Sequence, residues 1–206
     1  MPPEIKAVIF DYGMVLSKPQ LPELIERMVA LTALPPERFS SIYWGNRLAY
    51  DRGDLDGAQY WNLFGDMKAK LDELFQADGA SWNGIVASMV EWSFQLKSQG
   101  LRLGLLSNIP AEVRDYVIAR QSWMRDYDHC TFSCDVRRAK PEAEIYLECL
   151  RGLRVSAPEA IFIDDRPHNV AAALKLGLHA IVHRSEEETR QAVARLLARP
   201  GATIEG

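Results

Sequence analysis

The chain has 206 residues and a mass of 23.3 kDa, which suits one domain, or one core domain with an inserted segment. Hydrophobic residues make up 48% of the sequence and charged residues 25%, proportions typical of a folded globular protein and not of a disordered one. The net charge of -4, from 24 basic and 28 acidic residues, provides no basic surface, so we expect no nucleic-acid partner.

Neither the apolar runs nor the cysteines indicate a membrane or secreted protein. No run approaches the roughly 20 apolar residues of a membrane span, and the N-terminal residues around Glu4 and Lys6 do not resemble a signal peptide. Cys130, Cys134 and Cys149 form an odd set without paired metal-ligand spacing. Unpaired cysteines are typical of a reducing compartment, so we expect a cytoplasmic protein without a membrane partner. The sequence carries no signal for an oligomeric state.

The first predicted element is a buried strand over residues 5–10 that ends at Asp11. An apolar run of this length, entered through two prolines and left through Gly13, is typical of an inner strand of a parallel sheet. Ligands of such sheets bind outside the carboxyl ends of the strands, which places Asp11 where a substrate would lie. Taken alone, Asp11 is equally well explained as a residue that begins the next turn.

A helical segment then interrupts the strand pattern from about residue 17 to about residue 90. Apolar residues recur at helical spacing over residues 19–32, and the prolines at 35 and 36 begin a second stripe. The polar stretch 50–57 contains two glycines and predicts a loop.

The second half of this helical segment carries an aromatic stripe. It begins at Tyr60 and is predicted to break at Asp78-Gly79, and Ser81 is predicted to cap a further helix that ends at Gly100. We expect the aromatic residues to pack between helices and not to bind a cofactor.

Strands and helices alternate again after Gly100. Buried runs over residues 101–106, 160–163 and 179–182, and a shorter run over 127–133, are separated by stretches of helical spacing. This alternation predicts the α/β class: a Rossmann-like, doubly wound parallel sheet with a helical cap inserted after the first strand. We expect residues 1–16 and 91–206 to form the core, and residues 17–90 to form the cap.

Polar residues follow the later strands as Asp11 follows the first. Ser107 and Asn108 come after residues 101–106, the pair Asp164-Asp165 comes after residues 160–163, and Lys140 lies in a loop before a helix. The carboxyl ends of parallel strands share one edge of a sheet, so we expect these residues to meet there. Each also has a structural explanation, as a helix cap or a solvated charge, but their joint occurrence favours a site.

This set of residues suits the attack of a carboxylate on a phosphoryl group. Two unit charges of the same sign 4 Å apart repel by about 4 kcal/mol at an effective dielectric constant near 20, so the site must supply positive charge. Lys140 offers one charge, and Mg²⁺ held by Asp11 and the Asp164-Asp165 pair offers two more. The side chains of Ser107 and Asn108 can hydrogen-bond the phosphoryl oxygens.

In chain order, four segments resemble the motifs of the haloacid dehalogenase superfamily: Asp11-Tyr12-Gly13-Met14-Val15-Leu16, Ser107-Asn108, Lys140-Pro141-Glu142 and Asp164-Asp165. The resemblance covers nearly the whole chain. Within the superfamily the sequence is most similar to the branch that contains alpha-D-glucose-1-phosphate phosphatase. Two stretches carry that similarity, Asp11-Tyr12-Gly13 and the cap stretch Arg52-Gly53-Asp54-Leu55.

The resemblance implies a Mg²⁺-dependent phosphatase that acts on a small phosphorylated metabolite, a sugar phosphate, through an aspartyl-phosphate intermediate. It makes Asp11 the nucleophile and a metal ligand, with the Gly13 carbonyl and Asp165 as further ligands and Asp164 as a ligand either directly or through water. Ser107 and Lys140 would act on the transferring phosphoryl group. Asn108 and, from the cap, Arg52 complete the residues expected to bind substrate.

Gly13 departs from the family pattern. Most phosphatases of the superfamily carry a second Asp at this position, which protonates the leaving oxygen and is worth about 10²- to 10⁴-fold in rate as a general acid. Three outcomes are open: water or a cap residue, with Asp51, Asp54 and His168 as candidates, replaces the acid; the leaving group needs little help; or turnover is largely lost. We favour the second.

Three other functions compete with the phosphatase. Gly13 allows a catalytically impaired protein that binds a phosphorylated metabolite or regulates through it. Hydrolysis of a carbon–halogen bond ranks lower, because the superfamily's dehalogenases carry a tyrosine two residues after the nucleophile, whereas Tyr12 is one residue after it. A mutase is also open, although the missing acid counts against it.

Overall fold

A five-stranded parallel sheet forms the centre of the structure, a computed structural model that describes residues 4–198. The strand order is β3-β2-β1-β4-β5, and every neighbouring pair is parallel. The strands are β1 (Ala7–Phe10), β2 (Arg102–Ser107), β3 (His129–Phe132), β4 (Ala160–Asp164) and β5 (His179–Val182). All residues of β1 and β4 are buried, which explains why their sequences are unbroken apolar runs that end in acidic residues.

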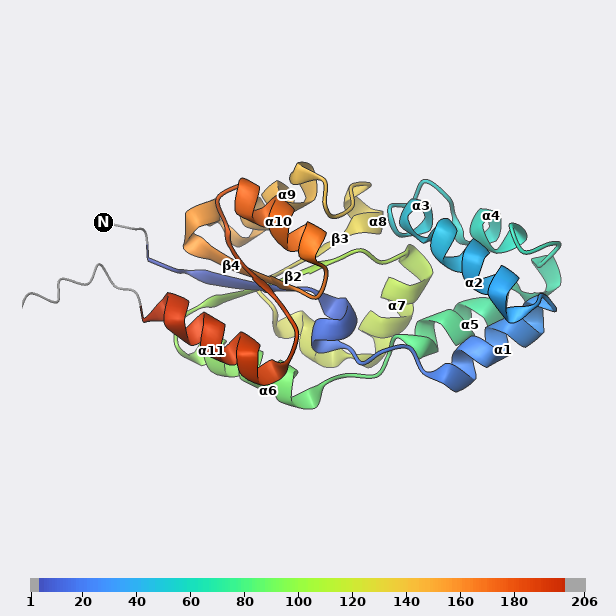
Figure 1. Ribbon diagram of the computed structural model, residues 1–206, viewed down its shortest axis with the longest axis horizontal. Helices are drawn as coiled ribbons and strands as arrows, with labels where there is room; N and C mark the ends of the chain where they lie inside the picture. Colours follow the sequence, from blue (N-terminus) through green and yellow to red (C-terminus); the bar gives the residue numbers. More distant parts are fainter. Residues whose placement is uncertain (1–3, 199–206) are drawn as a thin grey trace, which may run out of the picture.

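Helices cover both faces of the sheet (Figure 1). On one face, α9 (Ala143–Leu153) packs over β2 and β3 and α10 (Pro167–Lys175) over β4 and β5, around Ile9 and Phe162. On the other face, α6 (Ala87–Ser98), α7 (Ala111–Arg120) and α11 (Glu186–Leu197) pack around Phe10 and Leu103. This arrangement confirms the predicted α/β class and the Rossmann-like parallel sheet.

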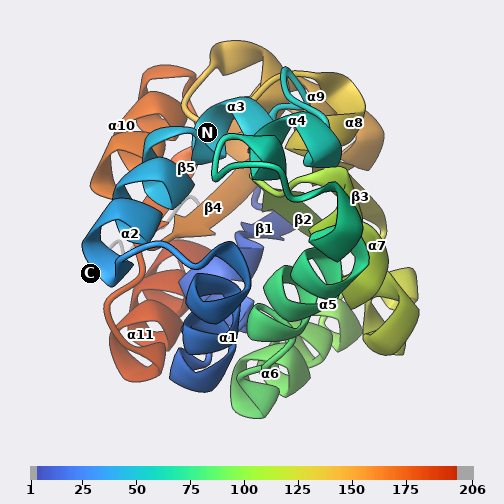
Figure 2. The same cartoon turned by 90° about the vertical axis from the view of Figure 1, so that its right-hand side faces the viewer.

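Five helices between β1 and β2 lie together beyond the carboxyl ends of the strands (Figures 1 and 2). They are α1 (Pro22–Thr32), α2 (Pro36–Gly45), α3 (Arg47–Asp51), α4 (Gly57–Asn62) and α5 (Leu71–Ser81). Their aromatic side chains form a separate buried cluster, which includes Phe39, Tyr43, Tyr50, Tyr60, Trp61 and Phe64. The aromatic stripe therefore packs between helices, as predicted.

Two predicted helix boundaries in this segment are wrong. Helix α5 passes through Asp78-Gly79, where a break was predicted, and ends at Ser81, which therefore does not cap the next helix. A Cβ at Gly79 would lie 2.4 Å from Cγ of Tyr116 on α7, so the glycine allows the two helices to approach closely. Asp78 is buried and lies 2.9 Å from Arg47, so its charge is compensated inside the helix bundle.

The helices of the described chain are short. The longest, α6 and α11, contain 12 residues each. Between residues 4 and 198, no helix combines the length and the apolar content that crossing a membrane requires.

Helix α6 begins before residue 90, the predicted boundary between the cap and the core, and its Met89 and Trp92 pack against the sheet.

Candidate active site

The carboxyl edge of the sheet places Asp11 beside Lys140. Asp11 directly follows β1, and its backbone N–H donates to the carbonyl of Ile163 on β4 at 2.8 Å. Lys140 Nζ lies 2.8 Å from Asp11 Oδ1 and 2.7 Å from Asp164 Oδ2, and it donates to the Leu106 carbonyl at 2.9 Å. Lys140 is only 2% exposed, so protein acceptors take all three of its ammonium protons.

The electrostatics of these three buried groups single out Asp11. Burial raises the pKa of Asp11 to about 7, although the Lys140 ammonium opposes the shift. Burial acts against the charge of Lys140, but the Asp11 and Asp164 carboxylates outweigh it and raise the lysine pKa. Burial also disfavours ionised Asp164, yet Lys140 and the N–H groups around Asp164 hold its pKa below the usual value. Of the two carboxylates that contact Lys140, Asp11 therefore has the negative charge that its surroundings compensate less well.

Asp11, Asp164 and Asp165 form a set of oxygen donors that fits a divalent cation. Each offers one carboxylate oxygen, and these atoms lie within 4.8 Å of one another. Burial and the neighbouring Asp164 carboxylate raise the pKa of Asp165, so negative charge is in excess at this point. Mg²⁺ prefers hard oxygen ligands of this kind. The residues therefore fit the cation that the sequence predicts.

The two carboxylates that end β4 differ in their surroundings. Asp164 is fully buried and accepts from the backbone N–H of Arg166 at 2.8 Å and from Asn169 Nδ2 at 3.0 Å, in addition to Lys140. Asp165 lines the cavity that Asp11 faces, whereas Asp164 does not. Asp165 is thus the more accessible of the two carboxylates, and Asp164 fixes the lysine.

Ser107 ends β2 and Asn108 follows it, and both line the same cavity. The Asn108 side chain makes two hydrogen bonds to the backbone of Lys140: its Oδ1 accepts from the N–H at 2.8 Å, and its Nδ2 donates to the carbonyl at 3.0 Å. Asn108 therefore holds the loop that carries the lysine, a role that the sequence did not reveal. One Nδ2 proton is left for a ligand.

Gly13 lies in the turn Tyr12–Leu16 that follows Asp11, and it also lines the cavity. Its φ of −62° and ψ of 130° are accessible to any residue. A Cβ at this position would meet only Trp82, at 3.8 Å, which is an ordinary contact. Neither the backbone nor the packing requires a glycine here, so the fold does not impose the absence of the second Asp.

The structure does not bring Arg52 into the cavity, contrary to the expectation that it binds substrate. Its Nε donates to Asp54 Oδ2 at 2.7 Å and its Nη1 to Glu142 Oε1 at 3.0 Å. Among the three candidate replacement acids, Asp51 lines the cavity, whereas Asp54 and His168 do not.

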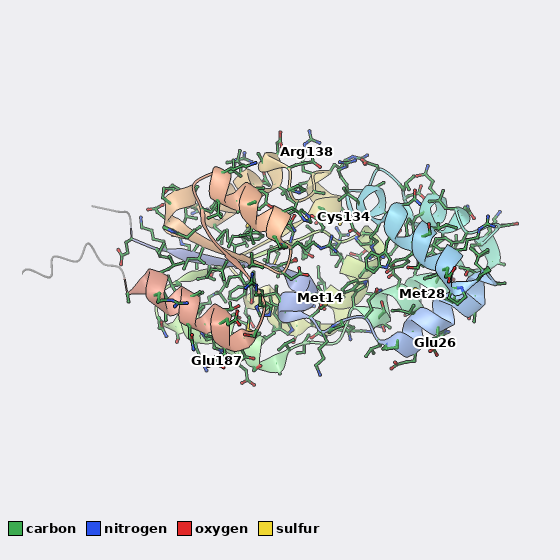
Figure 3. All side chains as sticks on the ribbon, viewed as in Figure 1. Met14, Glu26, Met28, Cys134, Arg138 and Glu187 are labelled. Atoms are coloured by element: carbon green, nitrogen blue, oxygen red, sulfur yellow. The ribbon has the colours of Figure 1, made fainter. Side chains whose placement is uncertain are left out.

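Helices α2 and α3 form a wall of the cavity, which has a volume of about 160 Å³. The sequence showed no sign of most lining residues outside the four motif segments: Arg47, Leu48, Trp82, Ile109, Val113, Arg166 and Asn169. Met14 stands in the first segment, where it was given no role. Met14 follows Gly13 and lies where the sheet meets helices α1–α5 (Figure 3). The four-residue spacing of Arg47 and Asp51 was a signal for an ion pair on one helix.

Arg47 connects this wall to the interior of the helix bundle. Its Nε donates to Asp51 Oδ1 at 2.8 Å, and its Nη1 donates to the Tyr43 hydroxyl at 2.6 Å and to Asp78 Oδ2 at 2.9 Å. The Tyr43 hydroxyl in turn donates to Asp78 Oδ1 at 2.6 Å. We call Tyr43, Arg47, Asp51 and Asp78 the buried charge network.

Hydrogen bonds also join the wall to the sheet. The Ser133 hydroxyl, at the start of α8 (Ser133–Val136), donates to the Asp51 carbonyl at 2.5 Å and accepts from the Ile109 N–H at 2.9 Å. The Tyr50 hydroxyl donates to Glu112 Oε2 on α7 at 2.9 Å. Helix α3 is thus fixed to the loop that follows Ser107.

The fold and the site define an α/β protein with a buried carboxylate–lysine pair and a potential cation site at the carboxyl ends of its strands. The family model of the haloacid dehalogenase-like hydrolases matches residues 5–177. The chain therefore belongs to this family of hydrolases.

Two relatives resemble the chain over most of their length. A phosphatase from Mycobacterium tuberculosis is 24% identical over 98% of both chains. A sesquiterpene phosphatase from Aspergillus oryzae is 28% identical over 84% of this chain and 87% of its own.

Solved structures share the fold. A HAD family enzyme from Bacteroides thetaiotaomicron superposes with a TM-score of 0.77 at 20% identity, over 93% of this chain and 99% of that one. A structure of the same enzyme with magnesium and inorganic phosphate gives a TM-score of 0.74 at 21% identity, over 88% of this chain and 96% of that one. L-2-haloacid dehalogenase from Xanthobacter autotrophicus gives 0.62 at 18% identity, over 94% and 84%.

Proposed function

We propose that the protein is a Mg²⁺-dependent phosphomonoester hydrolase that acts on a small phosphorylated metabolite. The observation that carries this proposal is the contact of 2.8 Å between Lys140 Nζ and Asp11 Oδ1, beside two further carboxylates in one cavity. The names of two relatives, both phosphatases, support it. The magnesium and phosphate in the Bacteroides thetaiotaomicron enzyme support the cation and the substrate class.

In the proposed reaction, an Asp11 oxygen attacks the phosphorus atom, and the bond between phosphorus and the alcohol oxygen breaks. The alcohol leaves with a proton from water, and a second water molecule hydrolyses the aspartyl-phosphate to free Asp11 and inorganic phosphate. Lys140 offsets negative charge on the phosphoryl group, and Ser107 donates a hydrogen bond to one of its oxygens. Mg²⁺, when bound, supplies further positive charge to the phosphoryl oxygens.

The assignments of individual residues are part of this proposal. Asp11 and Asp165 would hold the cation together with the Gly13 carbonyl, with Asp164 acting directly or through water. Residues 17–90 would act as a cap, because helices α1–α5 lie over the strand ends and supply a wall of the cavity. The sugar phosphate expected from the resemblance stays a prediction.

We expect phosphate release to require Mg²⁺. Without the cation, the carboxylates of the site repel the phosphoryl group, and only Lys140 offsets them. Phosphate release should be measured over a panel of phosphomonoesters, with EDTA and after Mg²⁺ is restored. Activity should fall to background with EDTA and return with Mg²⁺.

The same panel tests the competing functions. Unchanged activity in excess EDTA would contradict the role of the cation. Tight binding of phosphorylated compounds without any turnover would favour the non-enzymatic binding protein. Halide release from a 2-haloacid without Mg²⁺ would favour the dehalogenase.

We expect Gly13→Asp to raise the rate for esters of poor leaving groups by about 10²-fold, because it supplies a general acid where the chain has none. The backbone and the surrounding space accept a side chain at this position. The measurement is kcat for alkyl and aryl phosphates, and the aryl esters should gain less because phenolates leave easily. Gly13→Asn is the matched control: it adds the same volume without an acid. Equal effects of the two variants would show that an acid at position 13 is not what limits the rate.

A further inference from the structure

Exposed apolar side chains gather in the cavity that holds Asp11. Met14 is 42% exposed, Trp44 48% and Leu48 47%, and all three line the cavity. They are three of the seven large hydrophobic residues that are exposed in the described part of the chain. Such side chains scattered singly need no explanation, but a group of them at one site indicates an apolar ligand.

These side chains come from three separate elements and are backed by further apolar residues. Met14 lies in the turn after Asp11 (Figure 3), Trp44 at the end of α2 and Leu48 in α3. Trp82, Ile109 and Val113 line the same cavity. We call these six residues the apolar wall. The phosphoryl group occupies the Asp11–Lys140 end in the proposed function, so the apolar wall is left for the alcohol.

Few polar groups near the apolar wall are free to bind the hydroxyl groups of a ligand. The Arg47 guanidinium donates to Asp51 and Asp78, and these two carboxylates compensate its charge. The Asn169 amide donates to Asp164 at 3.0 Å. Trp82 Nε1 and Asn169 Oδ1 are buried without a hydrogen-bond partner among residues 4–198, so they offer one donor and one acceptor. Arg166 and the free Nδ2 proton of Asn108 are further donors in the lining.

A sugar would be poorly matched to this arrangement. Each of its hydroxyl groups needs a donor or an acceptor once it leaves water, and a hydroxyl buried without one weakens binding. An apolar alcohol has no such requirement and gains from burial against methyl, thioether and indole groups.

We infer that the substrate is the phosphate ester of an apolar alcohol, whose hydrocarbon part binds against Met14, Trp44 and Leu48. This inference rests on the proposed phosphatase function and specifies its substrate class. It replaces the sugar phosphate as the expected substrate. Leu48 and Trp44 then determine specificity and take no part in the chemical step.

The test compares two esters that differ in polarity but share their reacting group. Glucose 6-phosphate and cyclohexylmethyl phosphate each join the phosphate to a six-membered ring through one methylene group. A hydrophobic pocket discriminates against an added hydroxyl by about 10²-fold, so kcat/KM should be at least about 10²-fold higher for cyclohexylmethyl phosphate. Equal values, or a preference for glucose 6-phosphate, would overturn the inference and leave the phosphatase standing.

Variants of the apolar wall test which residues cause the preference for cyclohexylmethyl phosphate. Leu48→Asn should lower kcat/KM for cyclohexylmethyl phosphate by about 10-fold, the low end of the effect of one methylene-sized contact, and so narrow the preference for this ester over glucose 6-phosphate. Leu63→Asn is the matched control, because Leu63 is a 43% exposed leucine outside the cavity. Met14→Gln gives a second test with little change in volume. An unchanged preference in both Leu48→Asn and Met14→Gln would contradict the assigned binding surface.

Binding separates failure of this inference from failure of the proposed function. If neither these two esters nor any ester of the panel is hydrolysed with Mg²⁺ present, the phosphatase proposal fails. Calorimetric Kd values for the two esters then decide the inference alone. Tighter binding of cyclohexylmethyl phosphate supports it, and equal or weaker binding overturns it.

Discussion

Asp11→Asn is expected to reduce phosphate release by at least about 10⁴-fold, the scale of loss seen when a nucleophile or its partner is removed from an enzyme. The amide keeps the size of the carboxyl group but has no charge and no nucleophilic oxygen pair. It also removes one oxygen ligand from the set formed with Asp164 and Asp165. The measurement is kcat with saturating Mg²⁺, using the best ester of the panel.

The control for this variant is Asp115→Asn on α7, where the Asp115 side chain is 69% exposed and pairs with Arg114. It changes the net charge by the same amount and should leave kcat unchanged. If Asp11→Asn retained activity within 10-fold of the unmodified protein, Asp11 could not be the nucleophile.

Lys140→Met should lower kcat by about 10³-fold, which is the upper range for loss of one charge-stabilising donor. It should also destabilise the fold, because removing one partner of a buried ion pair costs about 3–5 kcal/mol. Both effects have one cause: Asp11 and Asp164 lose the ammonium that lies 2.8 and 2.7 Å from them. Kinetics on the panel and urea unfolding measure the two effects.

The stability effect should depend on pH. Lys140 opposes the burial that raises the Asp11 pKa, so the variant raises that pKa further. Protonated Asp11 carries no uncompensated charge, so the Asp11 part of the stability loss should be largest above the raised pKa of the variant, shrink as the pH falls towards 7, and stay constant below the native pKa of about 7. Lys97→Met is the control, since Lys97 is 37% exposed and pairs with Asp128 at 3.0 Å, a surface ion pair worth at most about 1 kcal/mol. Equal stabilities of the two variants at pH 8 would contradict the predicted role of the buried pair.

The sheet and its edge could be predicted because their signals are local. A strand buried on both faces must be apolar throughout, so β1, β2 and β4 were visible as runs that stop at Asp11, Ser107 and Asp164. Helix α7 (Ala111–Arg120) lies between two of the predicted runs, where helical spacing was expected. The sequence order of these segments was sufficient to place them at one edge.

The course of α5 could not be predicted, because residues far away in the chain decide it. A glycine next to an aspartate usually ends a helix, but here Tyr116 packs against Gly79 and Arg47 pairs with Asp78. Both partners lie more than 30 residues away along the chain, so the spacing of apolar residues in α5 does not reveal them.

Contacts between segments that are distant in the chain also limit what could be predicted of the site. The motif residues were predictable from their strands, whereas the wall opposite them depends on how α2 and α3 pack onto the sheet. Arg52 and Arg47 illustrate this: they are five residues apart, and the structure places Arg47 at the cavity and turns Arg52 toward Glu142. Met14, Trp44 and Leu48 carry no functional signal individually and become informative only once they are seen together.

The buried charge network has a consequence for how this cavity can respond to its ligands. Tyr43, Asp51 and Asp78 hold the Arg47 guanidinium from within the helix bundle, so moving the junction of α2 and α3 would break a buried ion pair. This wall of the cavity is therefore pre-organised, and ligand binding does not change its shape. We therefore expect the junction of α2 and α3 to keep its position when a phosphate ester binds.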